Sequence, residues 1–82
     1  MFIKNYKELD LFKKAVEGCR NAVLLLTPEG IQYNLKKPAE FIKGIPELMR
    51  ARKDHMEAEI YTRGFDDDMR MFDFINKCRA MA

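Results

Sequence analysis

The chain has 82 residues, 48% of them hydrophobic and 34% charged, which is the composition of one small globular domain and not of a disordered chain. Its net charge of +2 is too small to indicate nucleic-acid binding by itself, and no apolar run approaches the ~20 residues of a membrane span. It contains no serine and a single histidine, His55, which excludes a Ser-His-Asp triad. We expect one domain over residues 1–82.

The N-terminal part predicts a short strand followed by a helix. Residues 2–4 are the strand candidate. Asn5 is suited to cap a helix, and Glu8 follows three residues later, as in a capping box. Apolar residues then recur at helical spacing, which predicts a helix over residues 6–17 that ends near Gly18.

A β-hairpin is predicted next. Residues 22–27 (AVLLLT) form an apolar run typical of a buried strand. The turn that follows, TPEG, ends in Gly30, which we expect at positive φ. Residues 31–35 (IQYNL) alternate apolar and polar side chains, as in a strand with one solvent-facing side.

The second helical segment is predicted to be interrupted. Pro38 suits the first position of a helix. Gly44 and Pro46 should break it, because proline lacks the backbone N–H and clashes with the preceding turn. We expect a short helix to about Lys43 and a second turn or two over residues 46–52.

The C-terminal part predicts a strand and a final helix. Residues 55–63 alternate cleanly, and Gly64 ends the strand. The acidic residues 66–68 are expected to be helix-starting carboxylates, without the spacing of a calcium-binding loop. The helix is predicted over residues 67–79 and should bury some of Met71, Phe72, Phe74, Ile75 and Cys78.

The element order is therefore β-α-β-β-α-β-α, which predicts an α+β fold with helices against an antiparallel sheet. Two architectures use this order. The open-faced β-sandwich of the phosphocarrier HPr has strand order 1-4-2-3, and the ferredoxin-like fold has strand order 4-1-3-2.

Several stretches of the chain resemble the HPr family of the bacterial phosphotransferase system. They are FKKAVEGC, AVLLLTPEGIQYNL, KKPAEF and AEIYTRGFDDDMRMFDFI. The resemblance covers nearly the whole chain in element order, lengths and loop positions. It implies an HPr-like open-faced β-sandwich with a four-stranded antiparallel sheet and three helices on one face.

The family's phosphorylation sites are missing. The family carries a Gly-Leu-His-x-Arg-Pro run whose histidine accepts phosphate from enzyme I, and that histidine falls at about Asn5, with the arginine near Lys7 and the proline near Glu8. An asparagine amide has no basic nitrogen to phosphorylate. The family's regulatory serine falls near Lys37. The resemblance thus implies a degenerate member that is not a phosphocarrier.

From this resemblance we expect a protein-binding or regulatory module that is not an enzyme and uses no cofactor or metal. In HPr relatives the partner face combines the first strand-helix junction with the second helix. The matching positions, which we take as the predicted partner face, are Asn5, Lys7, Lys37, Pro38 and Phe41. Whether the junction of Asn5 and Lys7 also binds an anion stays open.

An alternative is a ferredoxin-like domain that binds RNA or a small regulatory ligand. The middle of the chain is basic, with Lys36, Lys37, Lys43, Arg50, Arg52 and Lys53. No aromatic residues interleave with these bases as they do in a stacking platform, so nucleic acid is the disfavoured partner. A second alternative, an enzyme using a reactive cysteine, would need Cys19 or Cys78 to be activated.

Two further expectations concern location and self-association. Because Lys4, Lys7 and Glu8 interrupt the N-terminal apolar residues, we expect no signal peptide, reduced Cys19 and Cys78, and a cytoplasmic protein. The open face of the sheet should carry Phe2 and Tyr61. A partly apolar open face indicates a partner or a homodimer.

Overall fold

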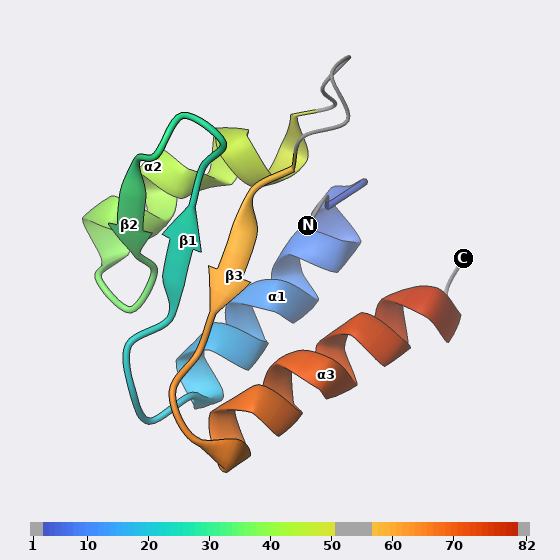
Figure 1. Cartoon of the computed structure of the whole chain (residues 1–82). Coiled ribbons are helices and arrows are strands. Elements are labelled where there is room, and N and C mark those ends of the chain that lie inside the picture. Colours follow the sequence, from blue (N-terminus) through green and yellow to red (C-terminus); the bar gives the residue numbers. More distant parts are fainter. Residues whose placement is uncertain (1–2, 51–56, 81–82) are drawn as a thin grey trace.

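The computed structural model describes residues 3–50 and 57–80, so His55 and Phe2 lie outside the described residues. Helices and strands follow one another in the order of Figure 1: α1 (Tyr6–Gly18), β1 (Leu24–Leu26), β2 (Gln32–Asn34), α2 (Pro38–Met49), β3 (Glu59–Tyr61) and α3 (Phe65–Ala80). Within the described ranges, each helix falls short of the length and apolar character that crossing a bilayer requires. The α+β class is confirmed.

The sheet is antiparallel, with the order β2-β1-β3. Leu25 of the central strand pairs with Tyr33 on one side and with Ile60 on the other. β1, β2 and β3 correspond to the expected strands over residues 22–27, 31–35 and 55–63, which are the second, third and fourth in the chain. In the strand order 1-4-2-3 the second strand lies between the third and the fourth, as it does here. The ferredoxin-like order 4-1-3-2 would have put the strands over residues 22–27 and 55–63 at opposite edges of the sheet. The pairing of Leu25 with Ile60 contradicts that alternative.

The expected N-terminal strand is not part of the sheet in the described residues, which hold three strands rather than the expected four. The backbone N–H of Ile3 donates to the carbonyl of Leu48 at 2.8 Å, so this segment is hydrogen-bonded to the end of α2. The Ile3 side chain is only 1% exposed and belongs to the core. Residue 3 is therefore buried, as its apolar character predicted. It contacts the end of α2, however, and does not form a strand of the sheet.

Helix α2 is continuous, and its predicted interruption is wrong. Pro46 lies inside the helix. There it removes one backbone donor, while Leu48 beyond it remains fully buried. Gly44 allows the close approach to the sheet: a Cβ atom at this position would lie 2.9 Å from the Leu25 side chain and 3.1 Å from that of Leu35. Packing of Gly44 and Leu48, on either side of Pro46, outweighs the local cost of the proline.

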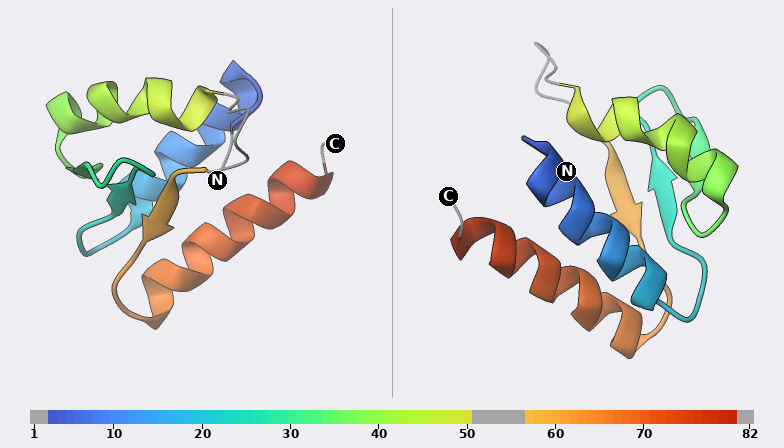
Figure 2. Two further views of the ribbon diagram at one scale, coloured as in Figure 1. Left: turned by 45° about the horizontal axis from the view of Figure 1, so that its top comes forward. Right: turned by 180° about the vertical axis from the view of Figure 1, so that it is seen from behind.

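Helix α1 lies between the other two helices. The strands lie in front of α1 and α2 in Figure 1 and behind them in the reverse view of Figure 2, so these helices cover the same face of the sheet. The α3 helix runs alongside α1 on the side away from α2 (Figure 2). Phe12 joins all three helices, with ring centroids 6.2 Å from Phe41 and 5.3 Å from Phe74.

Element boundaries follow the local chemistry. Helix α1 spans the predicted residues, and Gly30 has the expected positive φ, +89°. Helix α3 begins at Phe65, two residues earlier than predicted, directly after Gly64 with φ +90°. The register of β1 with β3 places Tyr61 opposite Leu24, on the open face of the sheet as expected.

Candidate binding groove between the first two helices

A groove of about 480 Å³ runs between α1 and α2. Its two walls differ in chemistry. The α1 wall carries Tyr6, Asp10, Lys13 and Glu17, one exposed stripe of that helix, and the α2 wall carries Pro38, Ile42 and Ile45. Apolar side chains, including Leu9, Val16, Leu35 and Phe41, complete the lining. The groove is thus charged along one wall and apolar along the other.

Large apolar side chains are left in solvent at this groove. Tyr6 is 80% exposed and Ile42 is 67% exposed, although both line the groove together with the partly buried Phe41. Single exposed apolar residues need no explanation, but a concave cluster of them is typical of a binding surface. The same pattern would not arise from core packing, because a core residue would be covered by its neighbours.

Asn5 caps α1 as predicted. Its side-chain oxygen accepts from the backbone N–H of Glu8 at 2.9 Å. The Glu8 carboxylate in turn accepts from the backbone N–H of Lys4 at 3.1 Å, a variant of the reciprocal capping box. Lys7 is exposed, and neither Asn5 nor Lys7 lines the groove.

The other predicted partner residues lie at the start of α2. Pro38 and Phe41 line the groove, and the exposed Lys37 pairs with Glu40 at 3.7 Å. The two helices run in opposite directions, since the bond from Ile3 to Leu48 joins the start of α1 to the end of α2. The five residues of the predicted partner face therefore form two groups at opposite ends of α1, and only Pro38 and Phe41 lie in the groove.

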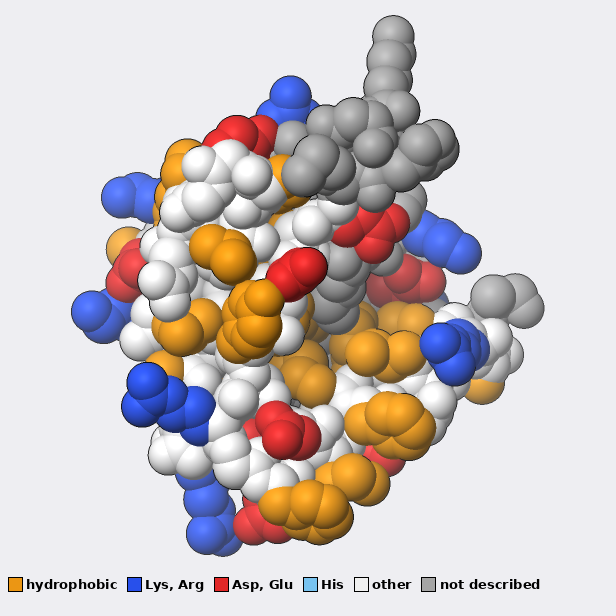
Figure 3. Space-filling view, in the orientation of Figure 1, with side chains coloured by type: hydrophobic (Ala, Val, Ile, Leu, Met, Phe, Trp, Pro, Cys, Tyr) orange, Lys and Arg blue, Asp and Glu red, His pale blue; other side chains and the backbone are white. Residues whose placement is uncertain are grey.

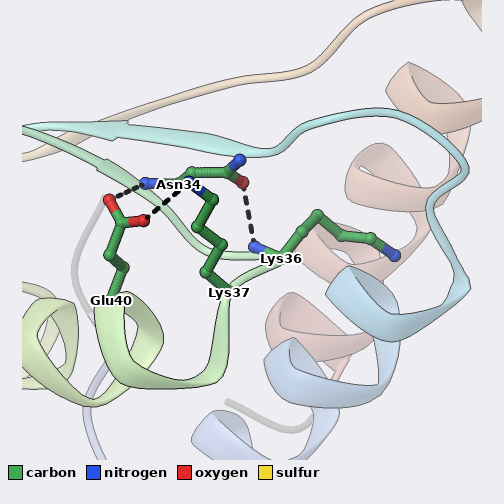
Figure 4. Close-up of polar contacts among 4 residues, drawn as sticks. All are labelled: Asn34, Lys36, Lys37 and Glu40. Carbon is green, nitrogen blue, oxygen red and sulfur yellow. Dashed lines mark hydrogen bonds and ion pairs between the residues drawn. The ribbon is translucent and has the colours of Figure 1, made fainter.

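Lys36 has a structural role that the sequence analysis missed. Its ammonium group donates to the carbonyls of Val16 (3.2 Å), Glu17 (3.4 Å) and Cys19 (2.5 Å), at the C-terminal end of α1. Figure 4 shows its side chain extending toward that helix. Lysine near a helix C-terminus satisfies unpaired carbonyls and complements the dipole. Lys36 thereby ties the loop before α2 to α1 and closes one end of the groove.

The loop before α2 is held by further polar contacts (Figure 4). The Asn34 side chain accepts from the backbone N–H of Lys36 at 3.1 Å, and the Glu40 carboxylate accepts from the backbone N–H of Asn34 at 3.1 Å. With Lys36 turned to α1 and Lys37 paired with Glu40, two members of the basic stretch are already engaged within the molecule. This arrangement further disfavours a nucleic-acid surface at this position.

Asp67 is more than a helix-starting acid. It is only 1% exposed, and its two carboxylate oxygens accept from the backbone N–H groups of Arg20 and Asn21, each at 2.9 Å. These hydrogen bonds hold the pKa of Asp67 below its usual value. Periodicity placed this residue at a helix start, but no local pattern indicates a contact with residues 46 and 47 positions earlier.

Neither cysteine has the lowered pKa of a reactive thiol. Cys19 is buried, and burial, reinforced by the Asp67 charge, raises the pKa of its thiol. Burial and the charge of Glu8 raise the pKa of the Cys78 thiol as well. A raised pKa leaves less thiolate, the nucleophilic form, at neutral pH. Both are free thiols, and within residues 3–50 and 57–80 no three metal-ligating side chains of His, Cys, Asp or Glu gather.

Comparison with protein-family models, with curated proteins and with solved structures found no match to this chain. The groove between α1 and α2 is therefore the main basis for a functional proposal.

Proposed function

We propose that this chain is a non-phosphorylatable, HPr-like cytoplasmic domain that acts by binding another protein in the groove between α1 and α2. The observation that carries the proposal is the groove itself, with its apolar α2 wall and the highly exposed Tyr6 and Ile42. The proposal includes no catalytic role and no cofactor.

The HPr-like part of the proposal has two supports. The neighbour order β2-β1-β3 agrees with the order of the corresponding strands in the resembling family. Asn5, at the position of the family's phosphate-accepting histidine, uses its side-chain oxygen to cap α1. An amide that caps a helix has neither the basic nitrogen nor the freedom to carry a phosphoryl group.

The two walls of the groove favour an amphipathic helix as the partner segment. Pro38, Ile42 and Ile45 recur at spacings of four and three residues, so they form a straight apolar edge along α2. Facing them, the α1 wall presents Asp10, Lys13 and Glu17, with alternating charge. A helix laid between the walls would put apolar side chains on α2 and opposite charges on α1.

Phosphocarrier activity is tested directly. The protein is incubated with phosphoenolpyruvate and enzyme I, and its mass is measured. We expect no added phosphate, while an authentic HPr in the same mixture gains one. Transfer of phosphate to this chain would overturn the non-phosphorylatable part of the proposal.

The groove is tested with a matched pair of variants. A photo-reactive amino acid is placed in an otherwise intact chain, either at Ile42 in the groove or at Ile31 in the hairpin, which is 50% exposed and outside the groove. We expect a discrete cross-linked protein in host extract from position 42 and not from position 31. The cross-link should disappear when Ile45→Glu is added. Equal cross-linking from both positions would contradict a specific groove.

Self-association is also part of the proposal. The open face of the sheet was expected to mediate it, through Phe2 and Tyr61. Tyr61 is 48% exposed on that face, and Phe2 lies outside the described residues.

A further inference from the structure

Helix α3 carries a second exposed apolar surface, away from the groove. Phe65, Met69 and Phe72, which we term the outer stripe, are 76%, 41% and 54% exposed. They follow one another at spacings of four and three residues, so they lie in one row along the helix. Figure 3 shows hydrophobic side chains along α3, on the same face of the molecule as the open side of the sheet.

The outer stripe is not explained by the packing of α3 within the chain. The inner side of the helix already supplies Met71 and Phe74 to the core, and Phe74 contacts Phe12. The opposite side of such a helix is normally polar. Ile75, beside the stripe, is a further exposed apolar residue at 39%. A surface helix with apolar residues on both sides indicates that something covers the outer one.

Charges on α3 suggest what covers it. The first turn is acidic and the last turn is basic. At about 100° per residue, Asp66 and Lys77 lie on one flank of the stripe, and Asp68 and Arg79 lie on the other. Each flank therefore begins with an acid and ends with a base, which makes the helix complementary to itself when a second copy runs in the opposite direction.

We propose that α3 pairs with α3 of a second copy of this chain, antiparallel, around a two-fold axis near Phe72. In this arrangement Phe72 meets Phe72 of the second copy, and Met69 and Phe65 extend the seam toward its two ends. Asp66 then lies beside Lys77 of the second copy, and the reverse pair forms at the other end. Such a two-fold contact uses the same surface twice and closes the assembly at a dimer.

Self-complementarity distinguishes a second copy from other occupants. A membrane surface would favour basic flanks on both ends of the stripe, but each flank here has an acidic end. The contact is also small, because one helix stripe exposes only part of the ~800 Å² per partner that stable complexes bury. We therefore expect a concentration-dependent dimer of micromolar rather than nanomolar affinity.

The test is the oligomeric state of the full chain by sedimentation equilibrium. Wild-type protein should be a monomer when dilute and a dimer at high concentration. Phe72→Asp should raise the dimer dissociation constant by at least about tenfold, because it places two carboxylates at the two-fold axis. Ile31→Asp, a charge of the same kind on an equally exposed isoleucine, should leave it unchanged. Circular dichroism checks that both variants are folded.

A charge exchange tests the antiparallel geometry. Asp66→Lys and Lys77→Asp should each weaken the dimer, and the double variant should restore it, because the exchange recreates both pairs in reversed order. A protein that stays monomeric at every concentration would overturn the proposal. So would a dimer that survives Phe72→Asp but is lost in Tyr61→Asp, which would place the contact on the open sheet face instead.

The proposed dimer contact and the proposed groove interaction can be disrupted by separate variants. Phe72→Asp should leave the cross-link from position 42 intact, while Ile45→Glu should remove that cross-link and leave the dimer intact. Loss of both functions in either variant would show that the two surfaces are not independent, and would contradict the assignment of the dimer contact to α3 alone.

Discussion

The two sides of helix α1 contrast. On the α3 side the helices are closed together by Phe12 against Phe74, with the loop after α1 bound to the buried Asp67. On the α2 side the hydrogen bonds lie at the two ends, from Ile3 to Leu48 and from Lys36 to Cys19. Phe12 stacks on Phe41 between them, and the groove lies over this contact. The hollow between α1 and α3 is about 240 Å³, half the volume of the groove between α1 and α2. Helix α1 thus packs more closely against α3 and leaves the larger open surface on its α2 side.

The difference lies in what each neighbouring helix presents. Helix α3 turns Met71 and Phe74 toward the core and keeps its other apolar residues on its far side. Helix α2 packs close to the sheet at Gly44, and its Ile42 and Ile45 line the groove.

Phe12→Ala should have the largest effect, because it breaks both sides at once. Removing a fully buried phenylalanine ring costs about 3–5 kcal/mol of unfolding free energy, which is a large part of the stability of a domain of this size. Urea denaturation followed by circular dichroism measures the loss. Tyr6→Ala, at an 80% exposed aromatic residue, should change stability by less than about 0.5 kcal/mol.

Asp67→Asn should have the next largest effect and should act on the α3 side alone. An asparagine side chain has one acceptor oxygen and an NH₂ group, so it cannot accept from the N–H groups of both Arg20 and Asn21. We expect a clear fall in melting temperature at pH 7. Asp66→Asn, at the neighbouring exposed carboxylate, should leave the melting temperature nearly unchanged when it is measured on dilute, monomeric protein.

The Asp67 effect should depend on pH. Because the folded-state pKa of Asp67 is lowered, its stabilising contribution is complete above the unfolded value of about 3.9 and is lost as pH falls through the folded value. The difference in melting temperature between wild type and Asp67→Asn should therefore be largest near neutral pH and shrink below about pH 4. A difference that stays constant down to pH 2 would contradict the role of the carboxylate.

Lys36→Met should have the smallest effect and should act on the α2 side. The variant keeps an aliphatic side chain but loses the donors to the carbonyls at the end of α1, so we expect a loss of about 1 kcal/mol in unfolding free energy. Lys37→Met removes only an exposed ion pair and should cost less than about 0.5 kcal/mol. Equal losses in the two variants would argue against a special role for Lys36.

Much of the local structure could be predicted from neighbouring residues. The Asn5 cap, the positive φ of Gly30 and the extent of α1 follow from interactions within a few positions, which sequence patterns report directly. The prediction that Pro46 interrupts the helix was wrong because it considered only neighbouring residues. The local penalty of the proline is real, but the burial of Leu48 beyond it is a contact with distant parts of the chain.

The candidate site was predicted only in part. Pro38 and Phe41 were placed on the partner face, and both line the groove. Ile42 and Ile45 line the groove as well, and nothing in the sequence indicated that these apolar residues would stay exposed to it. Lys36 and Asp67 were read as members of charge runs, because their partners are backbone groups 17 to 47 positions away.

The sequence by itself determined the α+β class, the alternation of short elements, the absence of serine, and the Asn5 cap at the start of the first helix. These properties depend on residue type and on periodicity over a few positions. The tertiary structure alone decided that residue 3 joins α2 instead of the sheet, and that a groove opens between α1 and α2. Such features depend on which distant backbone groups and side chains meet, and residue periodicity along one chain does not carry that information.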